Sequence, residues 1–85
     1  MTSNIIIYST SSCPYCVRAK ELLKRKGVSF TEILVDEDDK KRDEMIAKTN
    51  LYTVPQIFIN DQHIGGCDDL YALEREGKLT ELLNC

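Results

Sequence analysis

The feature that most constrains this sequence is a pair of cysteines, Cys13 and Cys16, between an apolar run and a helix-like run. Residues 4–8 are short, apolar and rich in isoleucine, which is typical of a buried strand. From Pro14 onward, apolar residues recur among charged ones with helical spacing. Proline suits the first helical position, where its missing N–H costs nothing. The two thiols are therefore expected where a strand ends and a helix begins.

Turn and cap residues divide the rest of the chain into further elements. Gly27 is suited to end the first helix, and Asp38 can cap the next one. Asn60 and Asp61 are suited to a hairpin turn. After the first helix the sequence predicts strands at 29–35, 56–59 and 62–64, and helices at 38–48, 68–75 and 78–83.

The predicted order is β-α-β-α-β-β-α-α, in one domain that spans residues 1–85. A right-handed crossover makes the first two strands parallel. The hairpin then adds two antiparallel strands. A CxxC pair that follows the first strand of such a unit indicates a thioredoxin-like arrangement. The sequence therefore predicts an α/β protein with a thioredoxin fold, in which helices cover both faces of a four-stranded mixed sheet.

Charge and the N-terminal run limit the function classes. The net charge is −3 and the basic residues form no long stripe, so we expect no nucleic-acid partner. The N-terminal apolar run is too short for a signal peptide or a membrane span. We therefore expect a monomeric cytoplasmic protein without membrane attachment. Because the cytosol keeps thiols reduced, its four cysteines are not expected to form a disulfide framework.

The start of a helix explains what the cysteine pair could do. Unpaired backbone N–H groups and the helix dipole stabilise a thiolate there. Cys13 lies where this effect is largest, whereas Cys16 lies about one turn further in and closer to the interior. Their spacing brings both sulfurs to one side of the helix. We therefore predict Cys13 as the attacking thiolate and Cys16 as the resolving thiol of a reversible disulfide.

Other uses of the four cysteines stay open at this point. A CxxC pair can be half of a zinc site, and the only candidates for a second ligand pair are His63 and Cys67. We expect His63 to face solvent and predict no metal site. Cys67 is interpreted as a small buried residue. Cys85, at the terminus, is interpreted as incidental.

Three stretches together resemble the signatures of the glutaredoxin family: CPYC at 13–16, TVPQIFI at 53–59 and GGCDDL at 65–70. They occur in the family's order and at similar spacing, and the resemblance extends from about Ile5 to Leu83. It is greatest to the small bacterial dithiol members. It implies no bound cofactor, glutathione as co-substrate, and NADPH acting only upstream through glutathione reductase.

The resemblance also implies residues that contact glutathione. It implies a cis peptide between Val54 and Pro55 facing the cysteine pair, whose backbone would pair with the cysteine of glutathione. Thr53 would line the same wall. Tyr15 would cover the disulfide, and Arg42 would meet the glycine carboxylate.

The γ-glutamyl end of glutathione would lie at the start of the helix after Gly66, since backbone N–H groups there bind carboxylates. The N–H groups of Cys67 and Asp68 would take the carboxylate. Asp68 or Asp69 would take the ammonium group. An alternative for Asp68 is a purely structural helix N-cap.

Three positions depart from the family pattern. Thr10 stands where many members carry a lysine, and Leu51 where a basic residue often precedes the TVP stretch. Asn50 replaces a glycine, although asparagine tolerates a left-handed backbone. The missing charges are expected to weaken thiolate stabilisation or glutathione binding, with Arg18 and Lys20 as partial substitutes.

The implied function is glutathione-dependent thiol–disulfide exchange on protein–glutathione mixed disulfides and protein disulfides, with ribonucleotide reductase among the conceivable substrates. Mixed disulfides need only Cys13, whereas protein disulfides also need Cys16. One alternative is a thioredoxin-like reductase, against which CPYC rather than CGPC argues. Another is a dimer that bridges an iron–sulfur cluster through Cys13 and glutathione, against which Pro14 argues.

Overall fold

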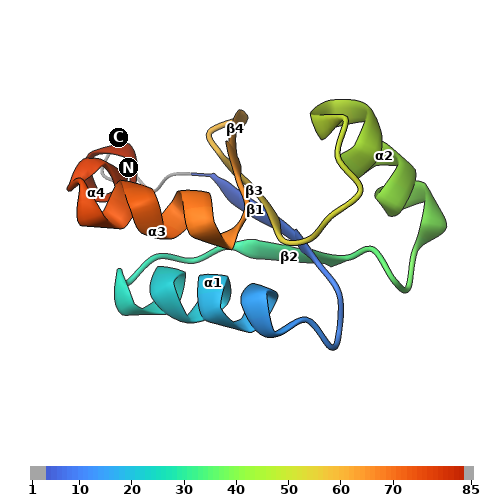
Figure 1. Cartoon of the computed structure of the whole chain (residues 1–85), viewed down its shortest axis with the longest axis horizontal. Coiled ribbons are helices and arrows are strands. Elements are labelled where there is room, and N and C mark those ends of the chain that lie inside the picture. The colour runs from blue at the N-terminus through green and yellow to red at the C-terminus, as the bar shows by residue number, and fades with distance from the viewer. Residues whose placement is uncertain (1–3, 84–85) are drawn as a thin grey trace.

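A twisted sheet lies at the centre of the computed structural model, which describes residues 4–83 (Figure 1). The elements follow in the predicted order. They are β1 (Ile5–Ser9), α1 (Pro14–Arg25), β2 (Thr31–Leu34), α2 (Asp39–Thr49), β3 (Gln56–Ile59), β4 (Gln62–Gly65), α3 (Cys67–Arg75) and α4 (Lys78–Leu83). The prediction for Cys85 lies outside the described residues.

The strands form one mixed sheet in the order β2-β1-β3-β4. β1 pairs in parallel with β2 and antiparallel with β3, and β3 pairs antiparallel with β4. Between β3 and β4, Asn60 and Asp61 have φ angles of 51° and 68°, which suits the tight turn of a hairpin. The predicted mixed sheet and its hairpin are thus confirmed.

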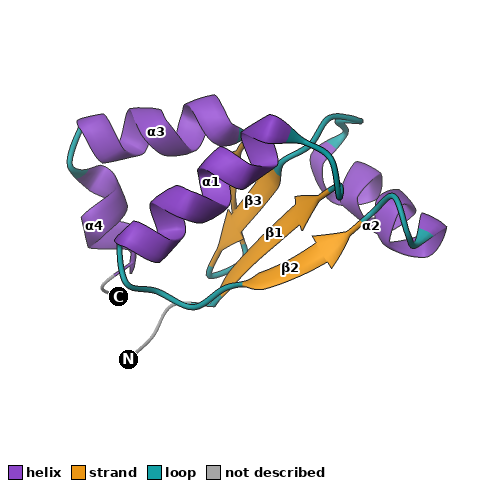
Figure 2. Cartoon of the chain, turned by 90° about the horizontal axis from the view of Figure 1, so that it is seen from below, coloured by secondary structure: helices purple, strands orange, loops and turns teal. Residues whose placement is uncertain are grey.

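Alternate residues of β1 face two separate cores. Ile5 and Ile7 pack against α1, α3 and α4, while Tyr8 packs on the other face with Met45 of α2. Figure 2 shows α1 and α3 side by side on one face of the sheet and α2 beyond its other face. Since side chains alternate along a strand, one β-strand can supply both cores. Helices therefore cover both faces, as predicted.

The predicted bounds were wrong for five elements. α2 spans Asp39–Thr49 instead of 38–48, and β4 ends at Gly65 instead of residue 64. β1 begins and ends one residue later than predicted, and α3 begins at Cys67 instead of residue 68. β2 is shorter than the predicted 29–35, because its pairing begins where Thr31 meets Ile6 near the start of β1. Phe30 precedes this paired segment and packs against the core under α1. An apolar residue beside a strand therefore need not belong to it.

Met45 is the one residue of α2 that is fully buried. Met45→Ala should lower the free energy of unfolding by about 2–5 kcal/mol, because the substitution leaves a cavity between α2 and the sheet. Urea denaturation would measure the change. Lys40→Ala, on the exposed side of the same helix, is the control and should change the value by less than about 0.5 kcal/mol. Equal losses in the two variants would contradict this account of α2.

Candidate active site

Cys13 lies where the chain passes from β1 into α1 and is the N-cap residue of that helix. Its Sγ accepts a hydrogen bond from the Cys16 N–H at 3.3 Å, and its carbonyl accepts one from the Val17 N–H at 3.1 Å. Pro14 occupies the first helical position. The sulfur therefore takes the place of a capping oxygen, at the positive end of the helix dipole. A negative charge on this sulfur would be stabilised by the Cys16 N–H and by the dipole of α1.

Cys16 has a different environment from its partner. Cys16 is 1% exposed, whereas Cys13 is half-buried. Burial, followed by a hydrogen bond with the Cys13 side chain, raises the pKa of the Cys16 thiol to about 12. Cys16 therefore keeps its proton at neutral pH. The predicted difference in exposure between the two cysteines is confirmed.

The peptide between Val54 and Pro55 is cis, as the family resemblance implied. The Cys13 thiol donates to the Val54 carbonyl across 3.9 Å, so the loop before β3 lies against the end of α1. Asn50 begins this loop with a φ of 59°, which confirms that asparagine supplies the left-handed turn. The start of α1 and the loop before β3 thus meet at the Cys13 sulfur.

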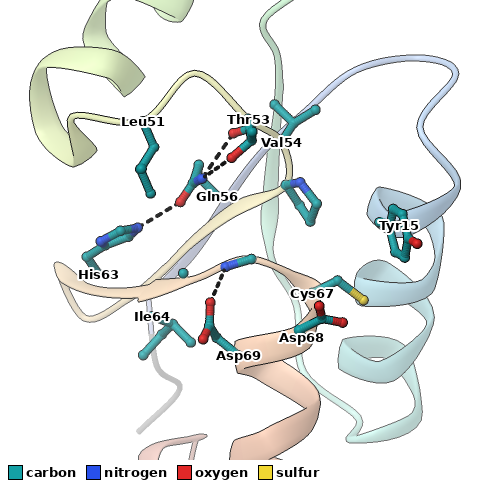
Figure 3. A pocket seen from close by; sticks show the side chains of 13 residues that line it. Tyr15, Leu51, Thr53, Val54, Gln56, His63, Ile64, Cys67, Asp68 and Asp69 are labelled. Atoms are coloured by element: carbon teal, nitrogen blue, oxygen red, sulfur yellow. Dashed lines mark hydrogen bonds between the residues drawn. The ribbon is translucent and has the colours of Figure 1, made fainter.

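A pocket of about 390 Å³ lies beside these residues (Figure 3). Every glutathione-contacting residue predicted from the sequence lines it, apart from Arg42. Its lining comes from the start of α1, the loop before β3, the β3–β4 hairpin and the start of α3. The residues are Tyr15, Leu51, Thr53, Val54, Pro55, Gln56, His63, Ile64, Gly65, Gly66, Cys67, Asp68 and Asp69.

The start of α3 forms the wall of the pocket opposite the loop. Gly66 is the N-cap residue, so the alternative that Asp68 caps the helix was wrong. The Asp69 carboxylate accepts the Gly66 N–H at 3.0 Å and ties the preceding turn to the helix. Gly65 has a φ of 120°, and a Cβ there would collide with that carboxylate. This wall therefore requires glycine at 65 and leaves the first N–H groups of α3 without intrahelical partners.

Cys67 is the first residue of α3 and is buried at the pocket wall. Burial raises the pKa of its thiol, which keeps Cys67 protonated and unreactive at neutral pH. The prediction of a small buried residue is confirmed.

Sequence reasoning missed Gln56 and the partner of His63. Gln56 is 2% exposed, and its amide joins Thr53 to His63 along the pocket wall. His63 is exposed, as predicted, but its Nε2 lies 2.8 Å from Gln56 Oε1. A glutamine inside an otherwise apolar strand sequence was the signal that could have revealed this contact, because buried amides need hydrogen-bond partners.

The cations expected near the site lie elsewhere. Arg42 is exposed in α2 and does not line the pocket, since this helix turns Met45 toward the sheet. Lys20 forms an ion pair with Glu32 at 2.6 Å, and the Arg18 guanidinium lies 5.8 Å from the centre of the Tyr71 ring. No lysine or arginine lines the pocket.

Residues 4–83 contain no group of three or more His, Cys, Asp or Glu side chains placed to hold a metal ion. Within the same residues, no helix has the length and apolar character needed to cross a membrane.

Alkylation would test the difference in reactivity between Cys13, Cys16 and Cys67. A Cys85→Ser variant is used, so that only these three thiols can react. Iodoacetamide at pH 7 should modify Cys13 first, because Cys16 and Cys67 are buried and protonated. Mass spectrometry of peptides after short reaction times would give the rates, and all three cysteines should react in denaturant. Labelling of Cys16 as fast as Cys13 in the folded protein would contradict the assignment.

Alkaline pH should destabilise the protein through Cys16. Its thiol has a pKa near 9.0 when solvated and about 12 in the fold, so the unfolded chain loses the proton first. The contribution of the Cys16 thiol to the free energy of unfolding is present below pH 9 and is lost as the pH rises toward 12. Urea denaturation at several pH values should show this decline. The free energy of unfolding should fall less steeply with pH in Cys16→Ala than in the Val17→Ala control. The same slope in both variants would refute the contribution of Cys16.

Comparison with known proteins places the chain in a family. The family model described as Glutaredoxin matches residues 5–64. The chain is 58% identical over 81 residues to Glutaredoxin 3 of Escherichia coli K12, covering 95% of this chain and 98% of that protein.

Solved structures give the same result. The fold resembles the buckwheat glutaredoxin–glutathione complex with a TM-score of 0.89 and 33% identity, over 96% of this chain and 77% of that one. A glutaredoxin from Brucella melitensis gives a TM-score of 0.85 and 54% identity, over 96% and 89% of the two chains. Family and fold support a thiol–disulfide oxidoreductase with a thioredoxin fold. The chain belongs to the glutaredoxin family.

Proposed function

We propose that this protein is a glutathione-dependent thiol–disulfide oxidoreductase that reduces protein–glutathione mixed disulfides and protein disulfides. The observation that carries the proposal is the position of the Cys13 sulfur. It accepts the Cys16 N–H at 3.3 Å and lies 3.9 Å from the Val54 carbonyl, beside the pocket. A sulfur at the positive end of a helix is thus next to backbone groups that an extended peptide can use.

Glutathione would bind along the loop before β3. Its cysteine backbone pairs with Val54 next to Pro55, which brings its sulfur to Cys13, and Thr53 lines the same wall. The buckwheat relative, solved as a glutaredoxin–glutathione complex, supports this choice of ligand. Tyr15 is 55% exposed at the pocket and covers the disulfide from the side of α1.

The γ-glutamyl group would lie at the start of α3. The N–H groups of Cys67 and Asp68, just after Gly66, donate hydrogen bonds to its carboxylate, because the first N–H groups of a helix are unpaired. Asp68 or Asp69 holds its ammonium group. At the opposite end, Arg42, which is exposed on α2 outside the pocket lining, is the residue we propose for the glycine carboxylate.

The reaction with a mixed disulfide needs only Cys13. Its thiolate attacks the glutathione sulfur, the bond to the substrate sulfur breaks, and the protein thiolate leaves and takes up a proton. A second glutathione thiolate then attacks the glutathione sulfur bound to Cys13. Oxidised glutathione leaves and the Cys13 thiolate is regenerated. Glutathione reductase would use NADPH to reduce the released disulfide, so the proposed reaction needs no cofactor bound to this chain.

A protein disulfide requires both cysteines. Attack by Cys13 gives a mixed disulfide with the substrate and releases one substrate thiol. Cys16 then attacks the Cys13 sulfur, and the bond between Cys13 and the substrate breaks. The second substrate thiolate leaves and takes the proton of Cys16, and the Cys13–Cys16 disulfide remains. Two glutathione molecules reduce this bond. We propose the cytoplasm as the site of the reaction, since its glutathione pool is reducing, and protein disulfides such as that of ribonucleotide reductase as substrates.

The two cysteine variants separate the proposed roles. Turnover of a small glutathione mixed disulfide is measured with glutathione reductase and NADPH. Cys13→Ser should abolish activity, because a serine hydroxyl does not ionise near neutral pH. Cys16→Ser should keep most activity on this substrate but lose reduction of a protein disulfide. Inactive wild-type protein, or equal losses in both variants on the mixed disulfide, would overturn the proposal.

A further inference from the structure

The side chain of Gln56 is buried at the start of β3, a strand whose other residues are apolar. Its Nε2 donates to the carbonyl oxygen of Thr53 at 3.0 Å and lies 3.2 Å from Thr53 Oγ1 (Figure 3). Its Oε1 lies 2.8 Å from His63 Nε2. Because a buried amide costs free energy unless it is hydrogen-bonded, all three contacts help to fix its position.

These contacts determine the orientation of the Gln56 side-chain amide, that is, the positions of its oxygen and its nitrogen. A carbonyl oxygen can only accept, so the Gln56 nitrogen must face Thr53 and the Gln56 oxygen must face His63. His63 Nε2 must then carry the proton and donate it. Both the neutral Nε2–H tautomer and the imidazolium satisfy this requirement. His63 therefore holds the Gln56 amide in the one orientation that can donate to Thr53.

The contact with Thr53 also fixes its neighbour. The Thr53 carbonyl and the Val54 N–H belong to one peptide unit, and the cis peptide of this loop is the next one, between Val54 and Pro55. In a trans peptide unit the C=O and N–H point in opposite directions. Gln56 holds the carbonyl on its own side, so the Val54 N–H points to the other side.

That other side is the side of Cys13. A residue before proline is restricted to extended conformations, in which its N–H and C=O point the same way. The Val54 carbonyl faces the Cys13 sulfur at 3.9 Å. The Val54 N–H is therefore directed toward the same space.

We infer that Gln56 and His63 are positioning residues that direct the Val54 N–H at the backbone of the disulfide substrate. The inference rests on the proposed function, in which Val54 pairs with the cysteine of glutathione. Without the amide, the peptide between Thr53 and Val54 can rotate, and recognition of the glutathione backbone weakens. The Cys13 sulfur, capped by the Cys16 N–H, keeps its reactivity.

Gln56→Met tests this directly, because methionine has a similar length but no hydrogen-bonding amide. The rate constant of Cys13 with oxidised glutathione should fall about fivefold, as expected for one lost hydrogen bond. The rate constant with iodoacetamide, which has no peptide backbone to pair, should stay within about twofold. An unchanged rate with oxidised glutathione in the folded variant, or a parallel fall in both rates, would overturn the inference.

His63 offers a matched pair of variants at an exposed position, which keeps the test decisive even if Gln56→Met does not fold. Both His63→Gln and His63→Leu lose the contact with the Phe58 ring. His63→Gln keeps a side-chain N–H donor and should react with oxidised glutathione at the wild-type rate. His63→Leu should be about fivefold slower. Equal rates in this pair would overturn the inference.

A further control separates this inference from the proposed function. Wild-type protein should react faster with oxidised glutathione than with hydroxyethyl disulfide, which lacks a peptide backbone. Equal rates with the two disulfides would overturn the proposed recognition of glutathione itself. A wild-type preference that persists in Gln56→Met and in His63→Leu would overturn only the positioning role.

Discussion

The site depends on one contact, in which a sulfur atom caps a helix. At a helix N-cap, a side-chain oxygen usually accepts a hydrogen bond from the backbone N–H two or three residues on. Here Cys13 Sγ accepts one from the Cys16 N–H at 3.3 Å. This contact ties the exposed sulfur to the backbone of the buried cysteine, so the two thiols differ in environment although they lie three residues apart. β1 is what carries Cys13 to this point, because its alternating side chains are anchored in two cores. The packing of the sheet thereby fixes the position of the Cys13 sulfur.

The opposite wall of the site is held by polar contacts. The loop before β3 contains no regular structure, and Gln56 joins it to β4 through Thr53 and His63. Asp69 plays a similar part at the start of α3, where its carboxylate holds the Gly66 N–H. Two polar side chains, the buried Gln56 and the exposed Asp69, thus fix the backbone on either side of the pocket. Backbone groups of the loop and of the start of α3 are left to line the pocket.

Charge is distributed unevenly around this pocket. Asp68 and Asp69 line it, whereas no lysine or arginine does. Two cations of α1 are engaged elsewhere, Lys20 with Glu32 and Arg18 over the ring of Tyr71. The hydrogen bond from Lys20, together with one from Ser9, holds the pKa of the Glu32 carboxyl below its usual range. Stabilisation of a negative sulfur therefore relies on the helix start more than on side-chain charge.

The sequence by itself determined the order of the elements, the mixed sheet and the sulfur at the helix start, and its resemblance to a known family implied eight of the thirteen residues that line the pocket. The elements and the place of the sulfur follow from local signals, because strand alternation, a proline at the first helical turn and glycine or asparagine at turns act over a few residues. The tertiary structure alone decided the bounds of β2, the position of Arg42 and the bridge from Gln56 to His63. The length of β2 is set by its pairing with β1, and the direction of Arg42 by the side of α2 that meets the sheet. The partner of Gln56 lies on another strand, so it became visible only once the hairpin had brought the two side chains together.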